Sequence, residues 1–255
     1  MNLKRIIGMI AIGVSIVSVH AQNTKVIAHR GFWKTDGSAQ NSITALEKAD
    51  SIGCYGSEFD VWLTKDNQLV VNHDPVFKLK SMERSKASTL TSLKLANDEN
   101  LPTLKEYLET GRTRNTRLIL ELKKHSKPER ETKAIEEIVA MVKKMGMEKQ
   151  MEYITFSLHA AKEFIRLAPV GTPVFYLNGD LSPQELKAIG CTGPDYHYSV
   201  FKKHPEWIDD SHRLGMKVNA WTVDNVDDMN WLIDRNVDFI TTNQPLLLQS
   251  ILEKN

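Results

Sequence analysis

Two acidic residues stand two positions apart in one apolar run of the chain, where they could share a bound ion. On a β-strand Glu58 and Asp60 point to the same face, because successive side chains alternate. Burying paired carboxylates is costly unless a cation or hydrogen bonds compensate. A second apolar run, Arg117–Glu121, ends on an acid, and Lys123 follows two positions later. We therefore expect Glu58, Asp60 and Glu121 to hold one divalent cation, Mg²⁺ or Ca²⁺, because all-oxygen ligand sets suit these ions.

Two histidines end other strand-like runs. His29 closes the first run, and His73 closes a later one beside Asp74. Cleavage of a phosphodiester needs a base for the attacking oxygen and an acid for the departing alkoxide, and histidine suits both tasks. Arg30 and Lys123 add positive charge and donors for phosphate oxygens. The residues predict a phosphodiester-cleaving centre in which either histidine can be the acid.

The order of the elements indicates how these residues come together. Short β-like runs alternate with helical periodicity, which is typical of a parallel sheet with crossover helices. Eight such runs are present: Val26–His29, Ser57–Leu63, Arg117–Glu121, Glu152–Phe156, Pro173–Leu177, Cys191–Tyr196, Lys217–Trp221 and Asp238–Thr242. This count predicts an α/β fold, a (β/α)8 TIM barrel, rather than a doubly wound open sheet, for which no Gly-rich phosphate turn follows the first run.

One segment departs from the alternation. A polar turn after the second run leads directly into another short strand, Leu69–Asn72, and an irregular polar insertion follows at about residues 75–100. Loops that follow barrel strands lie on the catalytic face. We therefore expect a small insertion after strand 2 that is either a lid or substrate-shaping flap, or a solvated decoration.

The first 21 residues have the pattern of a secretory signal peptide. Lys4 and Arg5 precede the uncharged run Ile6–Val19, and small residues follow at the cleavage positions. A membrane anchor is the alternative, but the run is shorter than the roughly 20 residues that span a bilayer. We predict that residues 1–21 are removed and that residues 22–255 form a single barrel domain. The protein is then exported to a periplasm or the medium, with no stable membrane insertion.

Bulk charge excludes one class of partner. The formal net charge of +1 becomes −1 once Lys4 and Arg5 are removed, so no general attraction to nucleic acid is expected. Cys54 and Cys191 precede different strand-like runs, and we expect two free buried thiols. His125, His159, His204 and His212 are expected on the surface or on helices, and His197 either contacts a head group or packs in a loop. The sequence leaves the oligomeric state open.

The motifs resemble those of the glycerophosphodiester phosphodiesterases. Along nearly the whole mature chain the family's hallmarks follow in order: Ala28-His29-Arg30-Gly31, Gln40-Asn41-Ser42, Glu58-Phe59-Asp60-Val61, Val70-Val71-Asn72-His73-Asp74, Glu121-Leu122-Lys123, Thr155-Phe156-Ser157, Ala220-Trp221-Thr222-Val223 and Val237-Asp238-Phe239-Ile240-Thr241-Thr242. The resemblance implies a phosphoric diester hydrolase that splits glycerophosphodiesters into sn-glycerol 3-phosphate and an alcohol. It also implies that His29 and His73 are the acid–base pair, and that Arg30 and Lys123 bind phosphate.

Two positions depart from the family pattern. Gln40, in Ala39-Gln40-Asn41, replaces the glutamate of a usual Pro-Glu-Asn, and Asn243 replaces a common aspartate. We expect Gln40 and Asn41 to support the centre from outside, and Trp221 to be a wall of the substrate pocket or part of the core. The alternatives are a phospholipase D-like lipid phosphodiesterase, or a non-catalytic exported protein that binds phosphorylated polyols.

Overall fold

Eight apolar runs form parallel strands in the computed structural model, which describes residues 24–254. The strands are β1 (Lys25–Ala28), β2 (Gly56–Leu63), β6 (Arg117–Leu122), β7 (Met151–Thr155), β8 (Val174–Tyr176), β9 (Gly193–His197), β10 (Asn219–Trp221) and β11 (Phe239–Thr242). Each pairs with the next in chain order, and pairing of β1 with both β2 and β11 closes the ring. The predicted TIM barrel is confirmed, and the predicted signal peptide lies outside the described residues.

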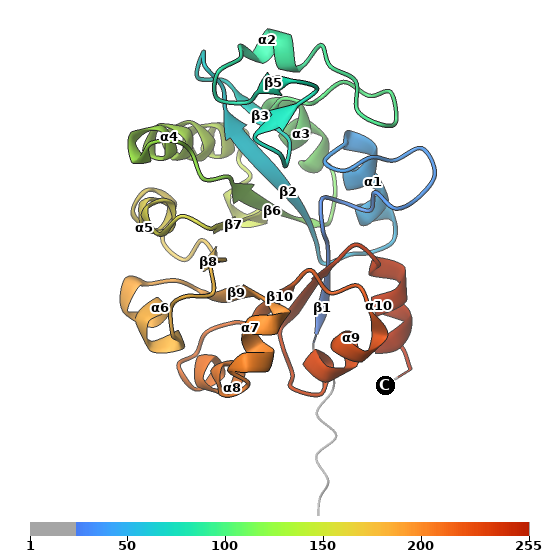
Figure 1. The fold of residues 1–255 in the computed structure, drawn as a ribbon, viewed down its shortest axis with the longest axis vertical. Helices are drawn as coiled ribbons and strands as arrows, with labels where there is room; N and C mark the ends of the chain where they lie inside the picture. The colour runs from blue at the N-terminus through green and yellow to red at the C-terminus, as the bar shows by residue number, and fades with distance from the viewer. Residues whose placement is uncertain (1–23, 255) are drawn as a thin grey trace, which may run out of the picture.

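Helices surround the barrel (Figure 1). They are α1 (Ile43–Ser51), α3 (Leu104–Gly111), α4 (Pro128–Met145), α5 (Leu158–Leu167), α6 (Pro183–Ile189), α7 (Tyr198–Lys203), α8 (Glu206–Arg213), α9 (Val226–Ile233) and α10 (Pro245–Leu252), with a 3₁₀ turn at Glu148–Gln150. Local sequence signals set their ends: Ser182 caps α6 ahead of Pro183, and Asn225 caps α9. Gly190 ends α6 in the left-handed conformation.

Apolar side chains form two separate layers, one inside the barrel and one between the barrel and its helices. The interior layer consists of Ile27, Ile119, Ile154, Phe175, Leu177 and Phe239. Below this layer, Glu152 closes the amino-terminal mouth by accepting a hydrogen bond of 2.6 Å from the Tyr55 hydroxyl and pairing with Arg117. The layer therefore separates a sealed end of the barrel from the carboxyl ends of the strands, where polar residues collect.

The second strand is long enough to have different partners along its length. Its first residues pair with β1, whereas Val61–Leu63 pair with β3 (Leu69–Val71) in antiparallel fashion. The extra strand predicted from the sequence is therefore confirmed. It leads the chain away from the barrel and positions His73 just beyond its end.

The insertion that follows β3 has a small apolar core of its own. It contains the two-stranded sheet of β4 (Val76–Phe77) and β5 (Lys80–Ser81) and the short helix α2 (Ala87–Leu90). Its side chains pack on the barrel through Trp62 and Val70, and this cluster comprises Ala39, Trp62, Val70, Met82, Ala87, Leu90, Leu95 and Leu101. In Figure 1 the insertion forms the top of the molecule beside α3. A purely solvated decoration would not contain such a buried cluster.

Cys54 and Cys191 are free and buried, as expected, and burial raises the pKa of each thiol to about 12. The placement of His125 on the surface or on a helix is wrong, since it is buried and its Nε2 accepts a hydrogen bond of 2.9 Å from the Leu63 amide.

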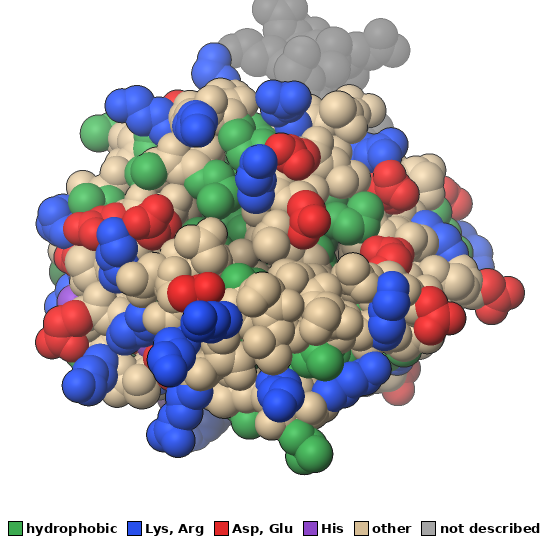
Figure 2. All heavy atoms as spheres, turned by 90° about the horizontal axis from the view of Figure 1, so that it is seen from above, with side chains coloured by type: hydrophobic (Ala, Val, Ile, Leu, Met, Phe, Trp, Pro, Cys, Tyr) green, Lys and Arg blue, Asp and Glu red, His purple; other side chains and the backbone are tan. Residues whose placement is uncertain are grey.

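Among residues 24–254, none of the helices combines the length and apolar character needed to cross a membrane. Figure 2 shows acidic and basic side chains interspersed over one face of the molecule.

Candidate active site

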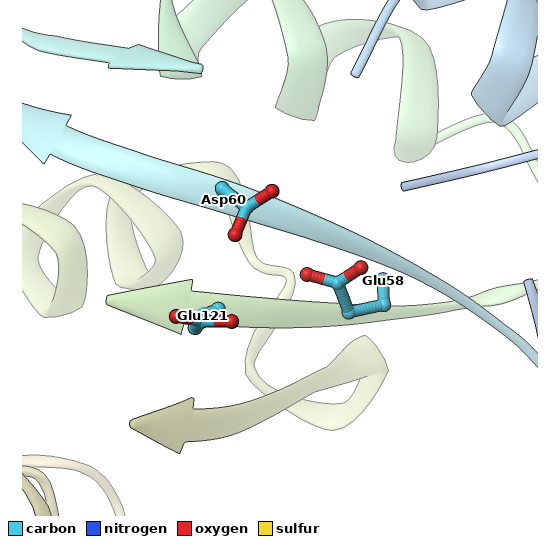
Figure 3. Close-up of side chains that lie close together, drawn as sticks. All are labelled: Glu58, Asp60 and Glu121. Carbon is cyan, nitrogen blue, oxygen red and sulfur yellow. The ribbon is translucent and has the colours of Figure 1, made fainter. Parts of the chain in front are cut away.

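Three buried carboxylates meet at the carboxyl end of two neighbouring strands. Glu58 and Asp60 come from β2 and Glu121 from β6, and the register pairs Asp60 directly with Glu121. One oxygen of each lies within 4.8 Å of the others, and all three side chains are buried. Figure 3 shows the three carboxylates turned toward one another. The structure thus brings together the acids that the sequence predicted.

The charges around these acids are unequal. Burial, and then the negative charges of Asp60 and Glu121, raise the pKa of Glu58 well above its usual range. Burial and Asp60 raise the pKa of Glu121 to about 7, although Lys123 opposes the change. For Asp60 burial acts in the same direction, but Lys123 and the other neighbouring positive groups outweigh it and lower the pKa. Glu58 and Glu121 therefore resist ionisation without a further cation, because the neighbouring positive groups do not balance three buried carboxylates.

The donor set fits a divalent cation. The Glu58 Oε1 atom is buried and has no hydrogen-bond partner among the described residues. Asp60 Oδ1 and Glu121 Oε1 face only the Lys123 ammonium, at 3.2 and 2.7 Å. Buried carboxylate oxygens without partners are expensive, and a hard cation with oxygen preference would satisfy all three.

The Asn243 side chain holds His29 in one orientation. Its Oδ1 lies 2.9 Å from His29 Nδ1 and accepts a 3.0 Å hydrogen bond from the Trp33 indole. The Asn243 amide nitrogen donates to an Asp224 carboxylate oxygen at 2.8 Å. Because an indole only donates and a carboxylate only accepts, the amide orientation is fixed. His29 Nδ1 must therefore carry its proton, which leaves the lone pair on Nε2.

The environment keeps this imidazole uncharged. Burial, followed by the nearby Arg30 guanidinium, lowers the pKa of His29 to about 4, and the Asn243 hydrogen bond only partly opposes this. His29 Nε2 lies 4.0 Å from Glu58 Oε2, so the lone pair faces the acidic cluster. Near neutral pH a neutral imidazole in this position can accept a proton.

The second histidine is arranged differently. His73 follows β3, and its Nδ1 lies 2.8 Å from the Asp74 carboxylate, which can only accept. The side chain of His73 is about one-third exposed (36%). Burial lowers the pKa of His73, while Asp60 and Asp74 act to raise it. A carboxylate therefore supports His73, whereas a neutral amide supports His29.

Arg30 is held by its backbone and its side chain. Its amide donates a 2.7 Å hydrogen bond to Glu58 Oε2, and its guanidinium donates to Gln40 Oε1 at 2.5 Å. Arg30 and Gly31 both have positive φ, and a Cβ on Gly31 would lie 2.7 Å from the backbone of Ala45 in α1. This tight turn directs Arg30 over the carboxylates. Gln40, where the family pattern has an acid, keeps its contact with the guanidinium without adding charge.

The side chain of Asn41 braces Asp60 from the outside. Its amide donates to Asp60 Oδ2 at 2.8 Å and its carbonyl accepts from the Asp60 backbone N–H at 3.1 Å. Asn41 is buried and has a φ of 60°, a conformation that asparagine tolerates better than most residues. Both predicted supporting residues, Gln40 and Asn41, thus contact residues of the centre.

These groups surround a cavity of about 90 Å³ inside the barrel mouth. The polar lining includes His29, Arg30, Glu58, His73 and Glu121, and the apolar lining is formed by Ile154, Phe156, Leu177 and Trp221. The Trp221 indole donates a 2.9 Å hydrogen bond to the Asp195 backbone carbonyl and meets Phe156 edge-on. Trp221 is therefore a wall of the cavity, one of the two positions expected for it.

Sequence reasoning missed residues that complete the surroundings. Asp195 lines the cavity from β9, although its two-residue spacing from His197 on a barrel strand was a usable signal. Trp33 and Asp224 act through Asn243 and lie in loops that carry no such pattern. Only closure of the barrel brings Asn243 to His29.

Comparison with known proteins gives consistent matches. The sequence model described as "Glycerophosphoryl diester phosphodiesterase family" matches residues 29–247. A crystal structure of a glycerophosphodiester phosphodiesterase from Parabacteroides distasonis is 53% identical, has a TM-score of 0.90, and covers 91% of this chain and 98% of that one. A glycerophosphodiester phosphodiesterase of Caldanaerobacter subterraneus subsp. tengcongensis is 29% identical over 91% of this chain and 98% of its own length.

A more distant structure shares the fold. A phosphodiesterase from Oleispira antarctica, solved in complex with the product sn-glycerol-3-phosphate, is 24% identical with a TM-score of 0.78. The alignment covers 90% of this chain and 96% of that one. This match supports the barrel architecture.

Proposed function

The chain belongs to the glycerophosphoryl diester phosphodiesterase family, and we propose that it hydrolyses glycerophosphodiesters to sn-glycerol 3-phosphate and an alcohol with one divalent cation and a pair of histidines. The family membership makes it a phosphoric diester hydrolase. The observation that carries the proposal is the convergence of Glu58, Asp60 and Glu121 with two oriented histidines on one small cavity.

The acidic cluster is the proposed cation site. Glu58, Asp60 and Glu121 would hold Mg²⁺ or Ca²⁺, and the ion would supply positive charge for a phosphate oxygen and for an attacking hydroxyl. Arg30 and Lys123 stand next to the same carboxylates, with Lys123 Nζ 2.7 Å from Glu121. Their positive charges are placed to bind the remaining phosphate oxygens.

The hydrogen bonds of the histidines suggest a division of work. His29 is the base, since Nδ1 donates to Asn243 and Nε2 is free to take the proton of the attacking hydroxyl. His73 is the acid, since the Asp74 carboxylate favours its protonated form and its ring is partly exposed to solvent. In a two-step reaction through a cyclic phosphate, the histidines would exchange these roles when water opens the ring.

Release of sn-glycerol 3-phosphate from glycerophosphocholine tests the proposal. The native protein is compared in Mg²⁺, in Ca²⁺ and in chelator, next to the variants His29→Ala and His73→Ala. Chelation and either substitution should each reduce turnover by at least about 100-fold, given the usual contribution of a general acid or base. His159→Ala is the matched control, because His159 is exposed on α5, and it should retain native activity.

Persistence of full turnover in chelator and in both variants would contradict the mechanism. Turnover of lysolipids in preference to water-soluble diesters would favour the phospholipase D-like alternative. Tight binding of glycerol phosphates without any turnover would favour the binding-protein alternative. We also propose export of the mature protein, to be tested by the size and compartment of the native chain in its host.

A further inference from the structure

A second buried acid faces the cavity from the side opposite the cation site. Asp195 lies on β9 and is 1% exposed, and its Oδ1 has no hydrogen-bond partner among the described residues. The residue lines the same cavity as His29 and Glu121. An unpartnered carboxyl oxygen inside a barrel is costly and adds nothing to the stability of the fold. The Oδ1 atom of Asp195 is therefore open to a hydrogen-bonding group of a ligand in the cavity.

The neighbours of Asp195 do not act as its counter-ions. The nearby charged groups that influence it are Glu121 and Glu152, both acidic. The adjacent Asn219 side chain hydrogen-bonds to the Asp195 carboxyl and also lies 2.9 Å from Thr241 Oγ1 through its Nδ2, which leaves Asp195 Oδ1 without a partner among the described residues. Asp195 therefore has polar neighbours on one side and the open cavity on the other.

The protonation state of Asp195 indicates which kind of ligand group can hydrogen-bond to it. Burial raises the pKa of Asp195 to about 8, with Asn219 acting in the opposite direction, so the carboxyl is mainly neutral near neutral pH. A neutral carboxyl both donates and accepts, which matches a hydroxyl group. Among residues 24–254, only Glu58, Asp60 and Glu121 form a group that could hold a metal ion, so a second ion at Asp195 would lack a set of protein ligands.

The residues around the cavity favour one hydroxyl of a glycerophosphodiester as the partner of Asp195. We expect the phosphate of a substrate to bind beside Arg30 and the cation site. The apolar lining around Trp221 can then pack against the carbon chain of glycerol. The hydroxyl that attacks phosphorus must remain near His29. The free terminal hydroxyl is the group left to meet the opposite side.

We propose that the Asp195 carboxyl binds the free terminal hydroxyl of the substrate's glycerol moiety and so selects glycerol over alcohols with fewer hydroxyl groups. This inference rests on the proposed function and names the group that determines its specificity. Asp195 also holds the cavity wall in place, because its backbone carbonyl accepts the hydrogen bond from the Trp221 indole. A substitution of the side chain leaves that backbone contact available.

The test compares two diesters that differ by one hydroxyl. Glycerophosphocholine is measured beside its analogue with propane-1,2-diol in place of glycerol, which keeps the attacking hydroxyl and lacks the terminal one. The native protein should prefer glycerophosphocholine by about 10- to 100-fold in kcat/KM, the usual cost of an unmade buried hydrogen bond. In Asp195→Ala this preference should fall to within about twofold, and Asp195→Asn should keep part of it.

Two measurements separate recognition from a structural role. A structural role would lower kcat/KM for both diesters equally and would lower Tm, whereas loss of a buried unpartnered carboxyl should leave Tm unchanged or raised. Asp227→Asn is the matched control, since Asp227 is exposed on α9, and it should keep the native preference. The inference is overturned if the native protein does not distinguish the diesters, or if Asp195→Ala distinguishes them as well as the native protein does.

A binding experiment separates this inference from the proposed function. If neither diester is hydrolysed, the proposed function fails, and calorimetry still compares sn-glycerol 3-phosphate with propane-1,2-diol 1-phosphate. Tighter binding of the glycerol compound that disappears in Asp195→Ala supports hydroxyl recognition. Equal binding of both compounds to the native protein refutes it.

Discussion

Replacing Glu58 by glutamine should uncouple the stability of the protein from divalent cations. Glu58, Asp60 and Glu121 are buried with ligand atoms within 4.8 Å of one another, so their mutual repulsion weakens the cation-free fold. Glu58→Gln keeps the size and one oxygen donor but removes one of the three charges. The cation-free variant should therefore be at least as stable as the native protein, while its affinity for the ion falls.

The size of the effect follows from linkage. A ligand at 100 times its dissociation constant stabilises the folded state by about 2.7 kcal/mol. For a domain of this size, about 2–4 °C of Tm corresponds to each kcal/mol, which gives a rise of about 5–10 °C in the native protein. In Glu58→Gln the rise should be under about 2 °C at the same concentration, because the ion binds far below saturation.

Thermal unfolding with Mg²⁺, Ca²⁺ or chelator at constant ionic strength measures this difference. Glu152→Gln is a matched control, since Glu152 is also buried in the barrel but interacts with Tyr55 and Arg117 at the opposite mouth. Glu152→Gln should have a lower Tm than the native protein in every condition, but its Tm should still rise when the cation is added. An equal rise in Glu58→Gln and the native protein would refute the assignment of the cation to the acidic cluster.

Three more outcomes follow from other contacts. Asn243→Ala should reduce kcat by about 10- to 100-fold, because His29 loses the partner that fixes its tautomer. Asn243→Asp should retain more activity than Asn243→Ala. The rate of product release measures both variants. Gly193→Ala should destabilise the fold by about 3 kcal/mol or more in urea unfolding, because a Cβ there would lie 1.7 Å from the Lys217 carbonyl oxygen. Burial acts to raise the pKa of Asp238, but hydrogen bonds from His212 and Lys217 outweigh it and lower the pKa in the folded protein below the ordinary value of 3.8. The ionised carboxylate therefore stabilises the fold at pH values above 3.8. This stabilisation is lost as the pH falls through the pKa of the folded protein. The Tm deficit of Asp238→Asn should therefore shrink between about pH 5 and pH 3, and a constant deficit would contradict the assignment.

Many features of the fold could be predicted because they depend on local patterns. Strand alternation is sufficient to place Glu58 and Asp60 on one face, and the helix capped by Ser182 begins where its side chain predicts. The buried core of the insertion was not predicted. Its apolar residues, such as Met82 and Leu90, are scattered among polar ones and become a cluster only by packing on Trp62.

The eight strands and the shared face of the two acids on β2 could be predicted from the sequence alone, since both follow from the geometry of a single strand. Contacts between residues far apart in the chain could not be predicted in this way. Closure of β1 against β11 brings Asn243 to His29, 214 positions apart, and the stagger of the strands puts Asp195 in the same cavity. Which residues face one another inside the barrel depends on the order and register of the strands, and a local sequence pattern contains no information on either.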